Sequence, residues 1–187
     1  MTNETLYLGA NPLNASATAV EGDYVTRDGE SFYRIANVDG MNDFFISVVS
    51  DSNHWMFIST RGGLSAGRTD CDSALFPYYT EDKIRDNSDN TGSRTIVIAD
   101  QGGKRMLWEP FSRSHTGIYR ITRNLYKNVL GDKLIFEETN HDLGLQFSYS
   151  WSTSDRFGFV KQSTIKATGN AESAVEILDG IENLLPY

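Results

Sequence analysis

The sequence predicts an all-β fold, an antiparallel β-sandwich within one domain. Aromatic residues make up 12% of the 187 residues, and aromatic side chains favour strands. Amphipathic helical runs are scarce, whereas Gly, Ser, Thr and Asn are frequent. Strand-like segments follow one another at roughly ten-residue spacings, with no helices between them. This order favours an antiparallel sandwich over a βαβ fold.

The first half of the chain gives weaker strand patterns than the second. Residues 1–30 are polar, and we expect an N-terminal arm with a first strand at Leu6–Leu8. The stretch from Arg61 to Ser93 has low hydropathy, which indicates either a large excursion or very short strands. The remaining strands of this half are predicted at Ser31–Val38, Phe44–Ser50 and Trp55–Thr60.

In the second half of the chain, apolar and polar residues alternate more clearly. Apolar and polar residues alternate strictly in Leu145–Ser152, so Phe147, Tyr149 and Trp151 share one face with Leu145. Period-2 alternation of this kind predicts a strand with one buried face. The other strands are predicted at Arg94–Ala99, Lys104–Glu109, Gly117–Tyr126, Lys133–Asn140, Phe157–Ala167 and Ser173–Asp179.

The C-terminal residues have a different pattern. Apolar residues recur there at the spacing of one helical face, namely Ile177, Ile181, Leu184 and Leu185. This pattern is compatible with a short C-terminal helix. We expect a β-sandwich domain over residues 1–180, and residues 181–187 to begin a further segment.

Charge and composition narrow the classes of partner. The net charge of −8 and the scattered basic residues argue against nucleic acid, whose binding depends on Lys and Arg at phosphates. No apolar stretch approaches the roughly 20 residues that span a bilayer, so no membrane partner is expected. Cys71 is the single cysteine, and the N-terminus has no apolar leader pattern. These observations favour a cytoplasmic location.

Three groups of residues invite a catalytic interpretation. Gly62–Thr69 approaches a phosphate-binding loop, but Arg68 stands where that motif has lysine, and a glycine-bearing turn is favoured. Glu137 and Glu138 are neighbours on a predicted strand and should point to opposite faces, one buried and one solvated. The three histidines share no metal-ligand spacing. We therefore predict no catalytic residue, no metal site and no cofactor.

Two stretches resemble a known family. They are Trp55–Ile84 and the segments Phe136–Gly144, Trp151–Val160 and Val175–Pro186. Their pattern and order are similar to the N-terminal region of large carbohydrate-active enzymes related to cellobiose phosphorylase. The resemblance implies a galactose-mutarotase-like β-supersandwich, followed by an (α/α)6 catalytic barrel that carries the catalytic residues. On this basis residues 181–187 begin a linker to a missing catalytic domain. It leaves open whether the parent enzyme hydrolyses or phosphorolyses its glycoside.

The resemblance predicts a non-catalytic domain that packs on the catalytic barrel and shapes a carbohydrate cleft or a homodimer interface. Two alternatives stay open: an independent carbohydrate-binding module, or a small mutarotase- or epimerase-like enzyme. Aromatic residues rimmed by charges in the long segment mark a contact with a protein partner or with carbohydrate. The candidate contact residues are Arg61, Arg68, Phe76, Tyr78, Tyr79 and Asp82.

Overall fold

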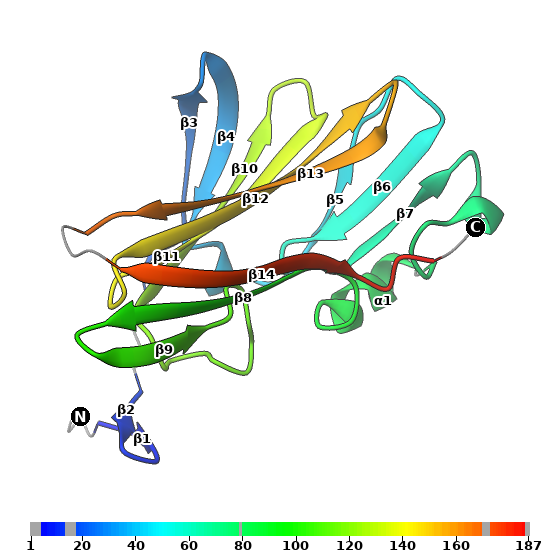
Figure 1. Ribbon diagram of the computed structural model, residues 1–187. Helices are drawn as coiled ribbons and strands as arrows, with labels where there is room; N and C mark the ends of the chain where they lie inside the picture. The colour runs from blue at the N-terminus through cyan, green and yellow to red at the C-terminus, as the bar shows by residue number, and fades with distance from the viewer. Residues whose placement is uncertain (1–4, 14–17, 79, 170–172, 186–187) are drawn as a thin grey trace.

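Antiparallel β-strands form nearly all of the regular structure (Figure 1). The computed structural model describes residues 5–13, 18–78, 80–169 and 173–185. The strands form sheets of six, three and three strands and a two-stranded ribbon, β1 (Tyr7–Leu8) with β2 (Asn11–Pro12). The prediction of an all-β antiparallel fold is confirmed.

The six-stranded sheet contains the strands whose sequence patterns are clearest. Its spatial order is β13-β12-β11-β10-β4-β3. The bounds are β3 Glu21–Arg27, β4 Glu30–Ala36, β10 Ile121–Asn128, β11 Lys133–Asn140, β12 Leu145–Ser154 and β13 Gly158–Ala167. Successive strands from β10 to β13 pair as hairpins, because short turns connect them.

Two smaller sheets complete the fold. One has the order β14-β8-β9, with β14 Ala174–Glu182, β8 Gly92–Gln101 and β9 Lys104–Trp108. The other has the order β5-β6-β7, with β5 Phe45–Val48, β6 His54–Ser59 and β7 Leu64–Arg68. Among the described residues, the connections contain four one-turn helices: η1 Val38–Gly40, η2 Cys71–Ser73, α1 Glu81–Ile84 and η3 Arg85–Asn87.

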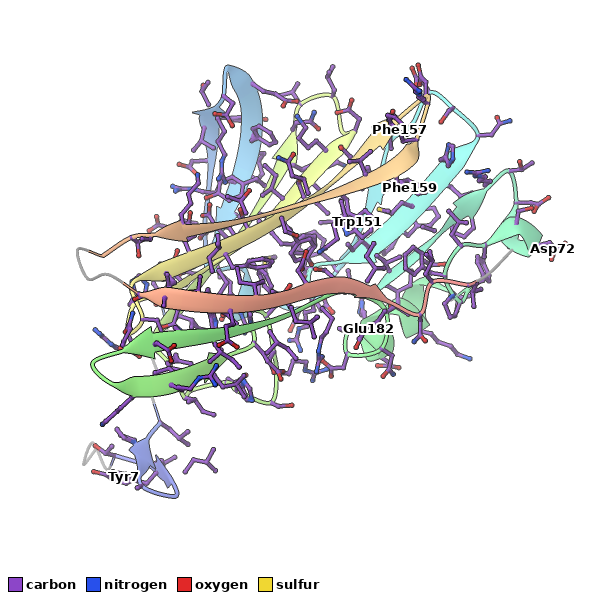
Figure 2. All side chains as sticks on the ribbon, in the orientation of Figure 1. Tyr7, Asp72, Trp151, Phe157, Phe159 and Glu182 are labelled. Carbon is purple, nitrogen blue, oxygen red and sulfur yellow. The ribbon has the colours of Figure 1, made fainter. Side chains whose placement is uncertain are left out.

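The six-stranded sheet and both three-stranded sheets contribute residues to the hydrophobic core. The predicted inner face of β12 is confirmed, since all four of its apolar residues are buried, and Trp151 lies among the sheets in Figure 2. The smaller sheets contribute Met56 and Ile58 from β6 and Val97 from β8. The apolar face of the six-stranded sheet therefore packs toward both smaller sheets.

The expected first strand at Leu6–Leu8 overlaps β1, but residues 1–30 also contain β3, which the sequence patterns did not reveal and which pairs with β4 along its whole length. At the C-terminus, the predicted strand Ser173–Asp179 is confirmed as part of β14. The expected short helix is wrong, because β14 continues to Glu182, and Ile177 and Ile181 pair with Val97 and Ser93 of β8. Backbone pairing with β8 prevails over the helical spacing of the apolar residues. Lys161 of β13 also binds Asp179 of β14, with Nζ 2.8 Å from both carboxylate oxygens.

The segment from Arg61 to Ser93 was expected to be a large excursion or a set of very short strands; it contains one short strand, β7, and the helical turns η2, α1 and η3, and it ends at the start of β8. Gly62 and Gly63 form the turn between β6 and β7, as predicted for a glycine-bearing turn, and no long helix follows them. Gly62 adopts a φ of 88°, a left-handed conformation that glycine adopts without strain. This turn positions Thr60 and Arg61 beside the cavity described below.

Candidate functional site

Two adjacent acids, Glu137 and Glu138, are buried in the middle of the six-stranded sheet. Their exposed fractions are 5% and 1%. They point to opposite faces of β11, as neighbours on a strand must. The expectation that one of them is solvated is wrong, because each acid is covered by polar partners from neighbouring segments. Buried charges of this kind need partners to offset the loss of hydration.

Glu138 lies on the apolar face and accepts three hydrogen bonds. Arg123 Nε is 2.7 Å from Oε2, Trp108 Nε1 is 2.8 Å from Oε1, and the Phe111 backbone N is 2.7 Å from Oε2. Arg123 is also the residue directly opposite Glu138 in the β10–β11 register. Opposite charges facing each other across paired strands stabilise a sheet.

The carboxylate of Glu138 also restrains a strained backbone. Phe111 has a φ of 65°, in the left-handed region where a bulky side chain is rare. Such a conformation costs about 1–3 kcal/mol and persists only where the surroundings fix it. The Phe111 ring packs edge-on against Tyr149, with centroids 5.3 Å apart. Its backbone hydrogen bond and its ring contacts together fix the loop between β9 and β10.

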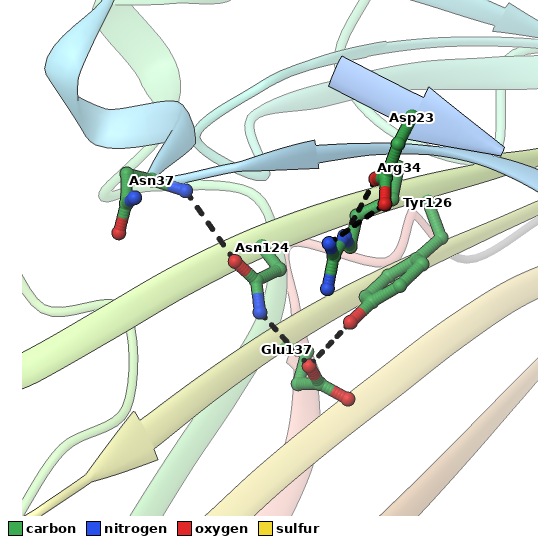
Figure 3. Close-up of polar contacts among 6 residues, drawn as sticks. All are labelled: Asp23, Arg34, Asn37, Asn124, Tyr126 and Glu137. Atoms are coloured by element: carbon green, nitrogen blue, oxygen red, sulfur yellow. Dashed lines mark hydrogen bonds and ion pairs between the residues drawn. The ribbon is translucent and has the colours of Figure 1, made fainter. Parts of the chain in front are cut away.

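Glu137 lies on the opposite, polar face (Figure 3). The hydroxyl of Tyr126 donates to Oε1 at 2.6 Å, and Asn124 Nδ2 donates to the same oxygen at 3.1 Å. Arg27 Nη2 lies 3.0 Å from Oε2, and its guanidinium stacks 4.3 Å above the Tyr126 ring. Burial and the hydrogen bond to Glu137 raise the pKa of Tyr126 to about 12.

A second ion pair extends this polar network across β3 and β4. Arg34 Nε and Nη2 each lie 2.8 Å from one carboxylate oxygen of Asp23, a bidentate contact. These hydrogen bonds to Asp23 raise the pKa of the Arg34 guanidinium. Figure 3 shows this pair on the strands next to Tyr126.

The two buried acids cannot act together on one bond. Glycoside hydrolysis needs two carboxyl groups that flank one glycosidic bond, about 5–9 Å apart. Glu137 and Glu138 instead project from opposite faces of one strand, and an arginine occupies one oxygen of each. Their geometry fits a role in tying strands together.

Another pair of acids meets on the surface. A hydrogen bond to Asp51 raises the pKa of Asp155, since two nearby carboxylates disfavour simultaneous ionisation. Both residues are exposed, on the turns between β5 and β6 and between β12 and β13. Exposed turns do not provide the water-excluded surroundings in which acid catalysis is efficient.

The predicted contact residues fall in different environments. Phe76 is buried, and its ring packs against Trp151 with centroids 6.5 Å apart, so it belongs to the core. Arg68 is exposed at the end of β7. Asp82 lies on α1, and Tyr79 lies outside the described residues. Arg61 and Tyr78 are both exposed, but Arg61 lines a cavity whereas Tyr78 packs against another surface ring, Trp55.

Tyr78 belongs to a surface row of four rings, which we call the aromatic row. It consists of Phe45, Phe57, Trp55 and Tyr78. The neighbouring centroids are 6.0 Å apart for Phe45 and Phe57, 6.2 Å for Trp55 and Phe57, and 5.9 Å for Trp55 and Tyr78. Phe45, Phe57 and Tyr78 are 37%, 38% and 54% exposed. The β5–β6–β7 sheet thus presents aromatic side chains to its surroundings.

The Trp55 ring is fixed in this row by two contacts. Its Nε1 donates to the backbone oxygen of Asp70 at 3.1 Å. The ring also lies close against Gly67, where an added Cβ would be 2.6 Å from Cζ2 of Trp55. Phe45 and Phe57 were missed by sequence reasoning. The available signal was that β6 is apolar on both faces, with Trp55 and Phe57 on one and Met56 and Ile58 on the other.

Arg61 lines a cavity of about 380 Å³ between the β6–β7 turn, η1, the β9–β10 loop and β10. Its lining includes two further arginines, Arg113 and Arg123, and the rings of Phe111 and Phe136. We call it the arginine cavity. Its volume falls within the range of small-molecule sites. The buried Glu138 binds Arg123 at this cavity.

No model of a known protein family matches the chain, and no curated protein matches it. Among the described residues, no helix has the length and apolar character needed to cross a membrane.

Proposed function

We propose that the chain is a non-catalytic, galactose-mutarotase-like β-sandwich domain of a multidomain glycoside phosphorylase- or hydrolase-like enzyme. In this proposal the aromatic row is the surface that packs on the (α/α)6 catalytic domain. The resemblance of Trp55–Ile84 and the C-terminal segments to such enzymes supports it. The antiparallel sheets around one shared core are compatible with a sandwich.

The exposed aromatic row is the observation that carries the proposal. Aromatic side chains are enriched at the centres of protein interfaces, where their burial stabilises the complex. Phe45, Phe57 and Tyr78 lose that stabilisation while they face solvent. Arg68 and Asp70 lie beside the row at the end of β7. An apolar centre with a polar rim is typical of a contact surface.

The alternative is a carbohydrate-binding module that stacks sugars on the same rings. Trp55 and Tyr78 favour it, because aromatic faces with polar edges suit sugar rings. The ring planes are less favourable: neighbours are inclined by 70°, 39° and 80° along the row. An extended sugar chain stacks best on rings that share a plane, whereas a protein surface can interdigitate with tilted rings. A small mutarotase-like enzyme is less supported, because arginines already pair with both buried acids.

Hydrogen exchange on the 187-residue chain and on the full-length protein tests the interface. We expect strong additional protection in the full-length protein over β5, β6 and residues 74–78, with little change on β3. Equal protection in both samples would contradict the proposal. The reading frame gives an independent test, since we expect it to continue into a region of helical periodicity.

Calorimetry with cello-oligosaccharides separates the two candidate functions. We expect no binding to the chain that depends on Trp55. The variants are Trp55→Ala and the control Tyr24→Ala, whose ring is exposed on β3 away from the row. Binding that Trp55→Ala abolishes and Tyr24→Ala preserves would replace the interface with a carbohydrate-binding module.

A further inference from the structure

The arginine cavity combines an apolar floor with a cationic wall. Phe111 and Phe136 supply aromatic surface, and their rings pack edge-on with centroids 6.3 Å apart. The lining residues of the cavity include Arg61, Arg113 and Arg123, against one acid, Asp39. A concentration of positive charge is unexpected in a chain with a net charge of −8. Such a site attracts anions against the overall charge of the protein.

Arg123 is held rigidly at the cavity wall. Its Nε binds Glu138 at 2.7 Å, and its Nη2 donates to the Ser112 backbone oxygen at 3.1 Å. The side chain is 14% exposed, and no hydrogen bond joins its Nη1 to a described residue. A guanidinium fixed in this way keeps a donor available to a ligand without further loss of side-chain freedom.

The other two guanidiniums are weakly engaged by the protein. Arg61 Nε lies 3.9 Å from Asp43 Oδ2, at the limit of an ion pair, and Asp43 also accepts a hydrogen bond from Thr60. Arg113 is exposed, and its side chain makes no ion pair with the described residues. Glu138 therefore offsets Arg123, while the charge of Arg113 is not offset and that of Arg61 is offset only in part.

We propose that the arginine cavity binds an anionic, oxygen-rich small molecule through a carboxylate or phosphate group. Arginine forms strong, charge-assisted hydrogen bonds with both groups. The phenylalanine floor suits the carbon skeleton of the ligand. A sugar acid and a sugar phosphate have the required chemistry. This site is separate from the aromatic row and does not depend on the proposed function.

Isothermal titration of the 187-residue chain with sodium glucuronate, inorganic phosphate and glucose tests the proposal. We expect one or both anions to bind with a dissociation constant of about a millimolar or tighter, and more weakly at high salt. Binding of glucuronate alone would identify a carboxylate ligand, and binding of phosphate alone a phosphate ligand. Glucose that binds as tightly as glucuronate, or no anion binding, would overturn the proposal.

Variants locate the site. Arg113→Ala should weaken anion binding about tenfold, because one charge-assisted contact is lost. It should leave the unfolding midpoint unchanged, since Arg113 is exposed. Arg156→Ala removes an exposed arginine at the β12–β13 turn and should bind anions like the parent chain. Equal effects of the two substitutions would show that any binding is non-specific and would refute the site.

Discussion

The two faces of β11 use neighbouring glutamates in different ways. Glu138 lies among apolar side chains, and its charged partner Arg123 is 14% exposed. Glu137 lies on the polar face, and its charged partner Arg27 is 25% exposed. Both acids are buried and paired, but only Arg27 keeps substantial contact with water. A buried carboxylate in a β protein is therefore no sign of catalysis until its partners and its face are known.

This comparison predicts its largest effect at Glu138. Glu138→Ala should lower the free energy of unfolding by about 3–5 kcal/mol, because it leaves the largely buried charge of Arg123 without its partner. The Trp108 indole and the Phe111 backbone would also lose their acceptor. Urea denaturation followed by tryptophan fluorescence measures the change. A loss below about 1 kcal/mol would contradict the importance given to this ion pair.

The matched substitution on the other face of β11, Glu137→Ala, should lower the free energy of unfolding by less. We expect about 1–3 kcal/mol for Glu137→Ala, because Arg27 can turn toward solvent once its partner is gone. The same denaturation experiment compares the two variants directly. A cost at Glu137 equal to or greater than that at Glu138 would show that the two faces do not differ as described.

The smallest effect concerns the phenol that binds Glu137. Tyr126→Phe should cost about 1 kcal/mol near neutral pH, the usual value of a hydrogen bond. Because the pKa of Tyr126 is raised from 10.0 to about 12, the unfolded chain releases this proton at lower pH than the folded chain does. The stability of the parent chain should therefore fall between about pH 10 and 12.

The pH dependence separates Tyr126 from other groups. Tyr126→Phe should remove about 2 kcal/mol of the alkaline loss of stability measured for the parent chain by pH 12. Burial also raises the pKa of Tyr149, so part of the slope should persist in the variant. An unchanged slope would mean that Tyr126 titrates normally in the folded protein.

Sequence reasoning was most accurate where one face of a strand is buried. It predicted the bounds of β11 and the alternation of β12, and burial of one face imposes period 2 on β12. It missed β3 because Glu21–Arg27 is an edge strand with mostly exposed, polar residues. It predicted a strand over Ser173–Asp179, which is part of β14, but it also expected a short C-terminal helix. Apolar residues four apart suit a helix and a strand alike, and pairing with β8 decides between them.

The candidate sites were less predictable, since they depend on register. Arg123, Trp108 and Phe111 reach Glu138 from separate parts of the chain, and only the β10–β11 pairing aligns Arg123 with it. Arg61 was singled out for a contact surface, but its neighbours in the cavity come from the β9–β10 loop and β10. Local sequence patterns carry no information on such convergence.

The most direct test of the central claim is a turnover assay. Both acids are assigned to strand pairing. The 187-residue chain at high concentration should therefore cleave no aryl-glycoside or cellobiose, either by water or by added phosphate. Glu137→Gln and Glu138→Gln keep the side-chain shape and serve as matched variants. The account predicts no turnover above the uncatalysed rate for the parent chain or either variant. Turnover by the parent chain that either substitution abolishes would contradict it.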